Sequence, residues 1–271
     1  MTLLGSSAKP YPDGCTLASK RSLAITALGT LAGALIEGGR LGWSHPLVIV
    51  GFAAAAVVGF LFVWREARAP QPMLPLSLFA HRMFALTALV GVLFNIAFYG
   101  LIFVLSLYFQ NIRGWSPFAT GLAFVPMMAM VLPANLVAAS VSERLGAPQT
   151  ITLASVITAV GCVALLPMAS DTSYWAIGAQ LLVLGGGLGL LVPPLTSTLL
   201  GSVDKSRSGI AAGVLNATRQ TGSVLGVALF GSLVGGGKEF ITGAHASLVI
   251  SAAVLLAGAI AISYGRAREP R

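Results

Sequence analysis

Long, nearly uninterrupted runs of apolar residues limit the fold of this chain more than any other feature. Eight such runs can be separated along its 271 residues, divided by charged stretches or by proline and glycine. Each is roughly 18–28 residues long, enough for an α-helix to cross a hydrocarbon core of about 30 Å. The runs cover 19–38, 47–64, 84–110, 118–141, 149–169, 174–199, 208–235 and 245–264.

The composition agrees with a membrane-embedded chain. Hydrophobic residues make up 56% of the sequence and charged residues only 9%, whereas a soluble domain has about 25% charged residues. In lipid every backbone polar group must be paired within the protein, and these runs are too long for the strands of a barrel. We therefore predict an all-α polytopic membrane protein with about eight transmembrane helices. A soluble enzyme, a disordered chain and a secreted disulfide scaffold are excluded.

The placement of the basic residues predicts the orientation. If the N-terminus is inside and the runs alternate, twelve Lys and Arg fall inside, three fall outside and Arg219 falls within a run. The outer three are Arg40, Arg113 and Lys238. Such an excess on one side is typical of cytoplasmic loops. We predict a multi-pass protein of the cell (plasma) membrane with both termini cytoplasmic, whose net charge of +8 faces lipid headgroups of the bilayer and not nucleic acid.

One polar, proline-rich connector divides the chain. Residues 65–83 contain three prolines and several basic residues, and they separate two apolar runs from six. Six helices are half of a common transporter architecture. The predicted units are a cytoplasmic N-terminal segment (1–21), a transmembrane hairpin (22–64), a cytoplasmic linker (65–83), a six-helix domain (84–264) and a cytoplasmic tail (265–271).

The residue patterns that indicate enzymes are missing. His45, His81 and His245 stand alone, and Cys15 and Cys162 form no ligand or redox motif. The glycine run before Lys238 lacks the spacing of a phosphate-binding loop. We predict no enzyme activity, no cofactor and no metal site.

Polar residues inside the apolar runs are the candidate functional residues, because each is costly in lipid unless it faces protein or water. In the run 208–235, Asn216 and Gln220 share one helix face with Gly209 and Gly213. Arg219 lies on the adjacent stripe, and burying an arginine there costs at least about 2.5 kcal/mol. Either these residues line or gate a polar cavity, or Arg219 extends to the headgroups and pairs with a carboxylate.

A second stripe lies in the run 84–110. Asn95, Tyr99 and Ser106 share a face, and Phe103 lies beside them. A wall of aromatic and amide groups suits large, partly apolar or cationic ligands, since aromatic faces attract cations. The alternative is hydrogen bonding between helices together with aromatic packing against lipid. Asn135 and Gln180 are further candidates of the same kind.

Glycine pairs and prolines predict how the helices pack. Four pairs have the small-xxx-small spacing that lets membrane helices approach closely, namely Gly29/Gly33, Gly185/Gly189, Gly209/Gly213 and Gly222/Gly226. Pro126, Pro133 and Pro193-Pro194 are expected to bend their helices. Bent helices packed on glycine suit a rocking transporter, although static packing would produce the same pattern.

Several short motifs resemble one family. They are Glu37–Trp43, Pro72–Phe79, Leu107–Gln110, Gly114–Pro117, Ala119–Gly121, Gly185–Gly189, Pro193–Thr196 and Gly213–Gln220. In this order and spacing they resemble the central and C-terminal regions of the fourteen-helix drug:proton antiporters of the major facilitator superfamily. The resemblance implies the C-terminal portion of a proton-coupled multidrug efflux protein that exports small hydrophobic or cationic compounds.

The resemblance also implies a gate and a missing partner. Glu143, Arg144 and Gly146 lie where the family has a cytoplasmic gating loop, although the family usually has Asp where Glu143 stands. The family's first six helices, with their proton-linked carboxylate, have no counterpart here, and no Asp or Glu lies in the middle of any apolar run. An N-terminal transporter half is therefore the expected partner. The alternative is a non-transporting membrane fragment, or a half-transporter that acts only with a partner half.

Overall fold

The computed structural model describes residues 14–68, 76–203, 208–235 and 240–267. Within these ranges all regular structure is helical, as the all-α prediction requires. The predicted segment 1–21, linker 65–83 and tail 265–271 lie partly outside the described residues, as do Lys205, Arg207 and Lys238. The helices are α1 (Gly14–Leu41), α2 (Pro46–Ala67), η1 (Leu76–Ala80), α3 (Arg82–Leu107), η2 (Tyr108–Ile112), α4 (Pro117–Ala123), α5 (Val125–Leu145), α6 (Ala147–Ala164), α7 (Tyr174–Gly201), α8 (Ser208–Val234) and α9 (Phe240–Ala267).

In the described part of the chain, seven helical segments are long and apolar enough to cross a membrane. Among them, α4 and α5 together form one segment, Pro117–Leu145, and α3 continues into η2. The predicted crossing 208–235 corresponds to the helix α8. This helix has 27 residues, but it is not among the seven segments that are apolar enough to cross a membrane. Asn216, Arg219 and Gln220 interrupt its apolar sequence and lower its mean hydropathy.

Local sequence explains several helix boundaries. Pro46 opens α2, where the ring of His45 accepts a hydrogen bond from the Leu47 N–H at 3.3 Å. Ser116 caps α4 in the same way, accepting from the Ala119 N–H at 3.2 Å. Both boundaries follow the usual preference for a side-chain acceptor before the first turn and for proline within it.

The predicted proline bends differ from one another. Pro133 lies inside α5, and Pro193 and Pro194 lie inside α7. Pro126 instead lies in the first turn of α5, two residues after Phe124, the C-cap of α4. Because proline has no N–H, it cannot donate the next backbone hydrogen bond that would extend α4. The apolar run 118–141 therefore forms two consecutive helices.

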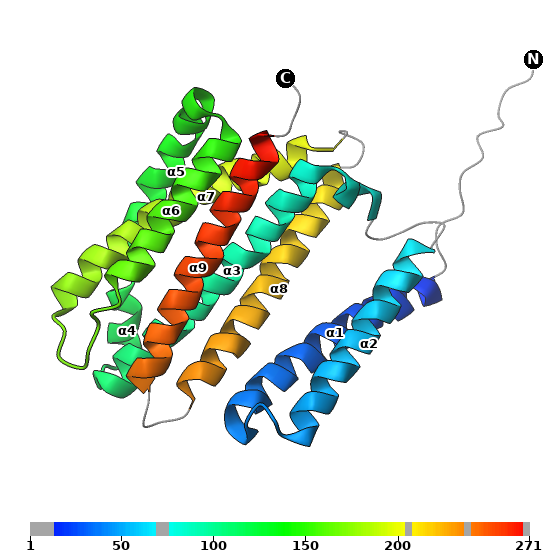
Figure 1. Cartoon of the computed structure of the whole chain (residues 1–271). Coiled ribbons are helices and arrows are strands. Elements are labelled where there is room, and N and C mark those ends of the chain that lie inside the picture. The colour runs from blue at the N-terminus through cyan, green and yellow to red at the C-terminus, as the bar shows by residue number, and fades with distance from the viewer. Residues whose placement is uncertain (1–13, 69–75, 204–207, 236–239, 268–271) are drawn as a thin grey trace, which may run out of the picture.

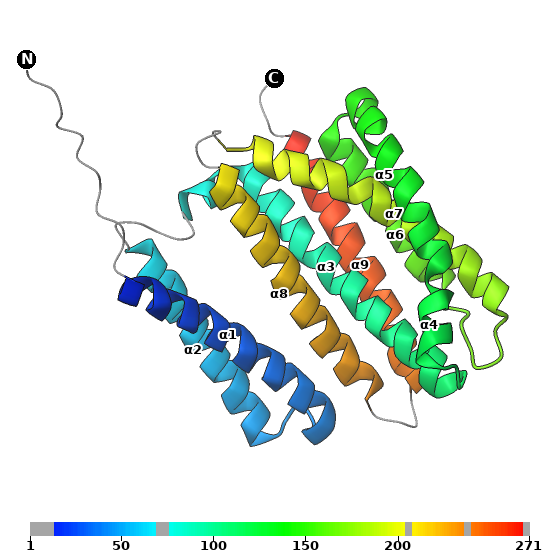
Figure 2. The same cartoon turned by 180° about the vertical axis from the view of Figure 1, so that it is seen from behind.

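After the linker, α3 lies between α8 and α9, while α1 and α2 form an antiparallel pair beside α8 (Figures 1 and 2). Helix α3 packs along α8 on one side and along α9 on another. Helices α5, α6 and α7 form the other part of the group and join α9 through α6. In Figure 1, α1 begins and α9 finishes at the upper ends of their helices, as an even number of crossings requires.

Glycine allows a close contact between α3 and α8. A Cβ placed on Gly222 would lie 2.6 Å from the Cβ of Asn95, and one on Gly100 would lie 2.9 Å from the carbonyl oxygen of Gly226. No side chain fits at such distances, so the two backbones meet directly. The predicted pair Gly222/Gly226 therefore lies in a close helix contact.

The other glycine pairs divide into two kinds. Gly185 and Gly189 of α7 lie against the backbone of α5, where the carbonyl oxygens of Met127 and Val131 leave no room for a Cβ. The pairs Gly29/Gly33 and Gly209/Gly213 have no atom within 4 Å of a Cβ placed on any of their members. In the hairpin the close approach occurs instead at Gly51, which faces Ala34.

Apolar side chains cover much of the outer surface. They are prominent on α2, α6 and α9, where the exposed residues include Val50, Phe60, Val160, Val163, Leu256 and Ile260. In water such a surface would drive aggregation, but in a bilayer it faces hydrocarbon at no cost. The surface therefore agrees with helices that are packed against lipid.

Candidate functional site

The polar surface of α8 is the clearest candidate site. We use this name for Asn216, Arg219 and Gln220, whose side chains are all exposed. At 1.5 Å per residue they lie about 12–18 Å from the start of a helix about 40 Å long. In a helix that crosses the bilayer, as we predict for 208–235, an arginine and two amides at this position are at the depth of the hydrocarbon core. At that depth each must face protein or water.

Arg219 has no counter-ion in the described part of the chain. No carboxylate of the described residues lies within 4.0 Å of its guanidinium, whereas Arg40 pairs with Glu37 at 2.9 Å. The alternative in which Arg219 pairs with a carboxylate of these ranges is therefore not seen. A counter-charge or water from elsewhere must solvate it.

The helical pair α1–α2 meets α8 away from this surface. A Cβ on Gly39 would lie 2.6 Å from the Cα of Ser232, so α1 approaches α8 near the end of both helices. Ser232 follows Asn216 by sixteen positions, which at 100° per residue places it about 160° around the helix. Gly209 and Gly213, which share the face of Asn216, likewise have open space around them.

The structure divides the α3 candidates between two environments. Asn95 is 5% exposed, and its Nδ2 donates to the Gly91 carbonyl oxygen at 2.6 Å. It therefore lies within the contact between α3 and α8. Tyr99, one turn later, is 41% exposed, and its ring meets the edge of Phe98 with centroids 5.0 Å apart. Only Tyr99 of this pair is available to a ligand.

The remaining four candidates, Phe103, Ser106, Asn135 and Gln180, are neither fully buried nor fully exposed. Phe103 packs on α8, since a Cβ on Gly231 would lie 3.1 Å from its ring. Ser106 is half-buried, and its carbonyl oxygen accepts from Gln110 Nε2 at 3.3 Å within the same helix. Asn135 of α5 and Gln180 of α7 are also half-buried. None of these four joins the polar surface of α8 through a hydrogen bond that the structure resolves.

The segment that resembles a gating loop is an abrupt turn. Helix α5 ends at Leu145 and α6 begins at Ala147, so Gly146 alone connects them. Its φ of 88° lies in the region that favours glycine, and its N–H donates to the Ser142 carbonyl oxygen at 2.9 Å. Glu143 and Arg144 are exposed in the last turn of α5.

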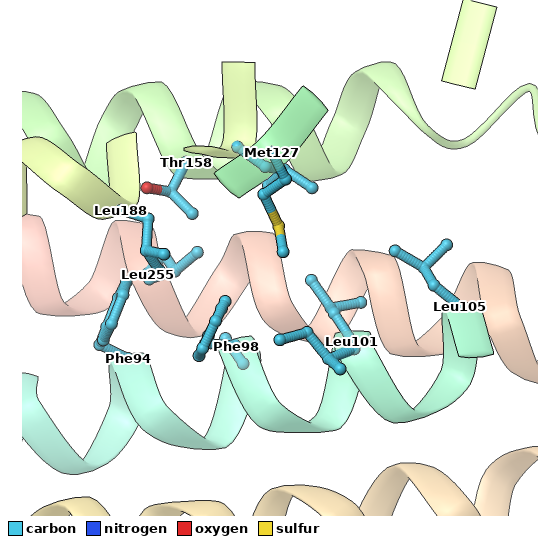
Figure 3. Close-up of a pocket in the computed structure, with 11 residues that line it drawn as sticks. Phe94, Phe98, Leu101, Leu105, Met127, Thr158, Leu188 and Leu255 are labelled. Carbon is cyan, nitrogen blue, oxygen red and sulfur yellow. The ribbon is translucent and has the colours of Figure 1, made fainter. Parts of the chain in front are cut away.

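A small cavity lies inside the six-helix group, between α3 and the helices α5, α6, α7 and α9 (Figure 3). Its volume is about 20 Å³, little more than the space of one water. Phe94, Phe98, Leu188 and Leu255 contribute to its apolar lining. The hydroxyl of Thr158 is already bonded to the Ala154 carbonyl oxygen at 2.8 Å. The cavity is therefore a packing gap and too small for a drug-sized ligand.

Within the described ranges, no three His, Cys, Asp or Glu side chains come together as metal ligands. The polar surface of α8 offers amide and guanidinium groups. Groups of this kind can form hydrogen bonds with a ligand or with water.

Comparison with known proteins identifies relatives that confer drug resistance. The chain is 35% identical over 235 residues to the methylenomycin A resistance protein of Streptomyces coelicolor, covering 86% of this chain and 50% of that protein. It is 34% identical to the methylenomycin A resistance protein of Bacillus subtilis, covering 87% and 51% of the two chains. The multidrug resistance protein Stp of Mycobacterium tuberculosis is 32% identical, with 80% and 40% covered. The chain thus spans about half the length of these curated relatives.

The family assignment rests on most of the chain. Residues 22–227 match the model of the Major Facilitator Superfamily, a family of membrane transporters and not of enzymes. That range reaches from the α1–α2 pair into the last third of α8 and includes Asn216, Arg219 and Gln220. The predicted resemblance is confirmed: this chain belongs to the major facilitator superfamily and is related to its drug-resistance and efflux proteins.

Proposed function

We propose that this chain forms the C-terminal portion of a proton-coupled exporter of hydrophobic or cationic compounds. The observation that supports this most strongly is the polar surface of α8. Asn216, Arg219 and Gln220 are exposed at mid-membrane depth on a helix otherwise fit to lie among apolar neighbours. A bilayer would penalise Arg219 alone by about 2.5–3.5 kcal/mol. A water-filled pathway for substrate removes that penalty.

The pathway needs a second wall. Gly209 and Gly213 have no neighbour within 4 Å of an added Cβ, and the curated relatives are about twice as long as the matched region. A second six-helix half placed opposite α8 would enclose the polar surface. That half would also supply the acidic group for proton coupling, since none lies in the middle of an apolar run of this chain. The required partner is therefore an N-terminal transporter half.

The side chains that would line this pathway indicate the class of substrate. Asn216 and Gln220 offer both donors and acceptors, and the exposed face of Tyr99 on α3 offers an aromatic surface. Aromatic rings attract organic cations by roughly 0.5–2 kcal/mol. Arg219 would repel a cation unless an acidic group of the partner half neutralises it. Compounds that combine apolar area with a delocalised or neutralisable charge fit such a pathway best.

The orientation belongs to the same proposal. We place the chain in the plasma membrane with both termini in the cytoplasm, which puts Glu143, Arg144 and Gly146 on the cytoplasmic side as part of a gate. Tags at the two ends, probed from outside intact cells, test this orientation. Both tags should be protected, and a tag that is reached from outside would disprove it.

Reconstitution tests the proposed activity. The chain alone in proteoliposomes should not export a cationic dye along a proton gradient. Together with the N-terminal half of the Streptomyces coelicolor relative it should do so, and Arg219→Ala should abolish that export while Arg40→Ala retains it. Export by the chain alone would disprove the need for a partner. A pair that assembles without exporting any dye would favour the alternative, a membrane protein that does not transport.

A further inference from the structure

The end of α3 is not an ordinary α-helix. Residues Tyr108–Ile112 form the π-helix η2, in which the Arg113 N–H donates to the Tyr108 carbonyl oxygen at 3.1 Å. The wider turn buries two successive side chains, Tyr108 and Phe109, completely. Such segments are rare, and they occur mostly as insertions in α-helices at functional positions. Here the insertion directs Tyr108 and Arg113 toward one connection between helices.

That connection, residues 165–173, joins α6 to α7 and is held by side chains from elsewhere. The Tyr108 hydroxyl donates to the Ala169 carbonyl oxygen at 2.6 Å. Arg113 Nη1 donates to the carbonyl oxygens of Ser170 and Thr172 at 3.2 and 2.6 Å. The partners are 57 to 61 positions apart in sequence. Only the tertiary fold brings them together.

A third side chain comes from α9. His245 Nε2 lies 2.8 Å from the Met168 carbonyl oxygen, and because a carbonyl only accepts, the ring N–H donates. Four carbonyl groups within five residues, 168, 169, 170 and 172, are thus bonded by side chains of η2, its following loop and α9. An irregular connection must satisfy its backbone groups in some way, and here protein side chains do so.

An aromatic cluster supports the same end of the group. Phe109 stacks on Trp115 with centroids 5.0 Å apart and meets Phe124 edge-on at 6.1 Å. Tyr174, at the start of α7, packs on Trp115 at 5.5 Å and donates its hydroxyl to the Ala123 carbonyl oxygen at 3.3 Å. Aromatic pairs in these geometries stabilise a contact beyond the burial of their surface. They join α3, α4 and α7 beside the bonded connection.

We propose that Tyr108, Arg113 and His245 form a latch that fixes the 165–173 connection and makes this end of the six-helix group a single rigid unit. In the latch, α3 and α9 both hold the link between α6 and α7, so none of these helices can separate there without breaking bonds to backbone carbonyls. The inference concerns the mechanics of this chain and does not depend on which compound is moved.

Hydrogen exchange of the full chain in lipid nanodiscs, read by mass spectrometry, tests the latch. Arg113→Gln removes two charge-assisted bonds, so amides of 166–173 should exchange at least about tenfold faster. Tyr108→Phe keeps the ring and removes one bond, and it should give a smaller increase at the same amides. Because the latch is shared, exchange should also rise around His245 in α9 but not at 147–152, at the other end of α6.

The matched control is Arg40→Gln. Arg40 is an exposed arginine whose partner, Glu37, lies in the same helix, and its replacement should leave exchange of 166–173 unchanged. Three results would overturn the latch. One is unchanged exchange at 166–173 in Arg113→Gln, another is an increase there that does not extend to α9, and the third is an equal increase along all helices. Tyr108→Phe keeps the test decisive if Arg113→Gln fails to fold.

Discussion

Gly226 of α8 lies directly against Ile96 of α3. A Cβ placed on Gly226 would come within 2.9 Å of the Ile96 Cα and would overlap that residue's carbonyl oxygen. Backbone therefore meets backbone at this point, and the position of α8 relative to α3 depends on the absence of a side chain. Because α8 contains the polar surface, this contact also determines where Asn216, Arg219 and Gln220 stand.

The first prediction compares the same substitution at two positions of α8. Gly226→Ala forces the α3–α8 contact apart and should lower the free energy of unfolding by about 1–3 kcal/mol. Gly213→Ala meets open space and should leave stability unchanged or raise it by up to about 1 kcal/mol through helix propensity. Unfolding in mixed micelles measures both. Equal effects at the two positions would show that the contact is looser than described.

The second prediction concerns the turn between α5 and α6. Gly146 has φ 88° and ψ 147°, a combination that essentially only glycine adopts. Gly146→Ala should therefore cost about 1–3 kcal/mol of stability. Gly59→Ala in α2, where no atom lies within 4 Å of an added Cβ, is the control and should not destabilise the chain. A neutral Gly146→Ala would indicate that the turn has another conformation.

The third prediction uses two leucines of α7. Leu188 borders the small cavity and is 8% exposed, whereas Leu182 is 42% exposed on the outer surface. Leu188→Ala enlarges an existing gap and should lower the unfolding free energy by about 2–5 kcal/mol. Leu182→Ala replaces a contact with lipid or detergent and should change it by less than about 0.5 kcal/mol. The thermal midpoint in detergent ranks the two, and a larger loss for Leu182 would contradict this packing.

Much of the fold follows from the apolar runs, because length and hydropathy determine where a helix can cross a membrane. The helix boundaries differ from the ends of these runs. The run 149–169 is a helix only to Ala164, and the run 245–264 begins earlier, at Phe240. The pair Gly222/Gly226 had the spacing of a close contact, but so did Gly209/Gly213, which has open space. Spacing shows that a helix can approach closely, and only the tertiary arrangement decides whether one does.

Part of the candidate site can be predicted from the sequence. Asn216, Arg219 and Gln220 stand out because polar groups are rare in apolar runs, and the structure places all three on the surface. Asn95 and Tyr99 had the same signal, yet Asn95 is used in the contact with Gly222. No pattern in the sequence links Tyr108, Arg113 and His245 to one another. Their partners are backbone carbonyls more than fifty positions away, which no local pattern records.

If the polar surface of α8 borders a water-filled pathway, a cysteine placed there reacts with a water-soluble thiol reagent, whereas a cysteine facing lipid does not. In a background with Cys15→Ser and Cys162→Ser, Gln220→Cys is compared with Leu256→Cys, an exposed apolar position of α9. Both variants are treated with a charged thiol reagent that does not enter lipid, in membrane fragments whose two faces are both in contact with the solution. Gln220→Cys should be labelled rapidly, and Leu256→Cys should not be labelled until detergent dissolves the membrane. An unlabelled Gln220→Cys, or equal labelling at both positions, would contradict a water-filled pathway.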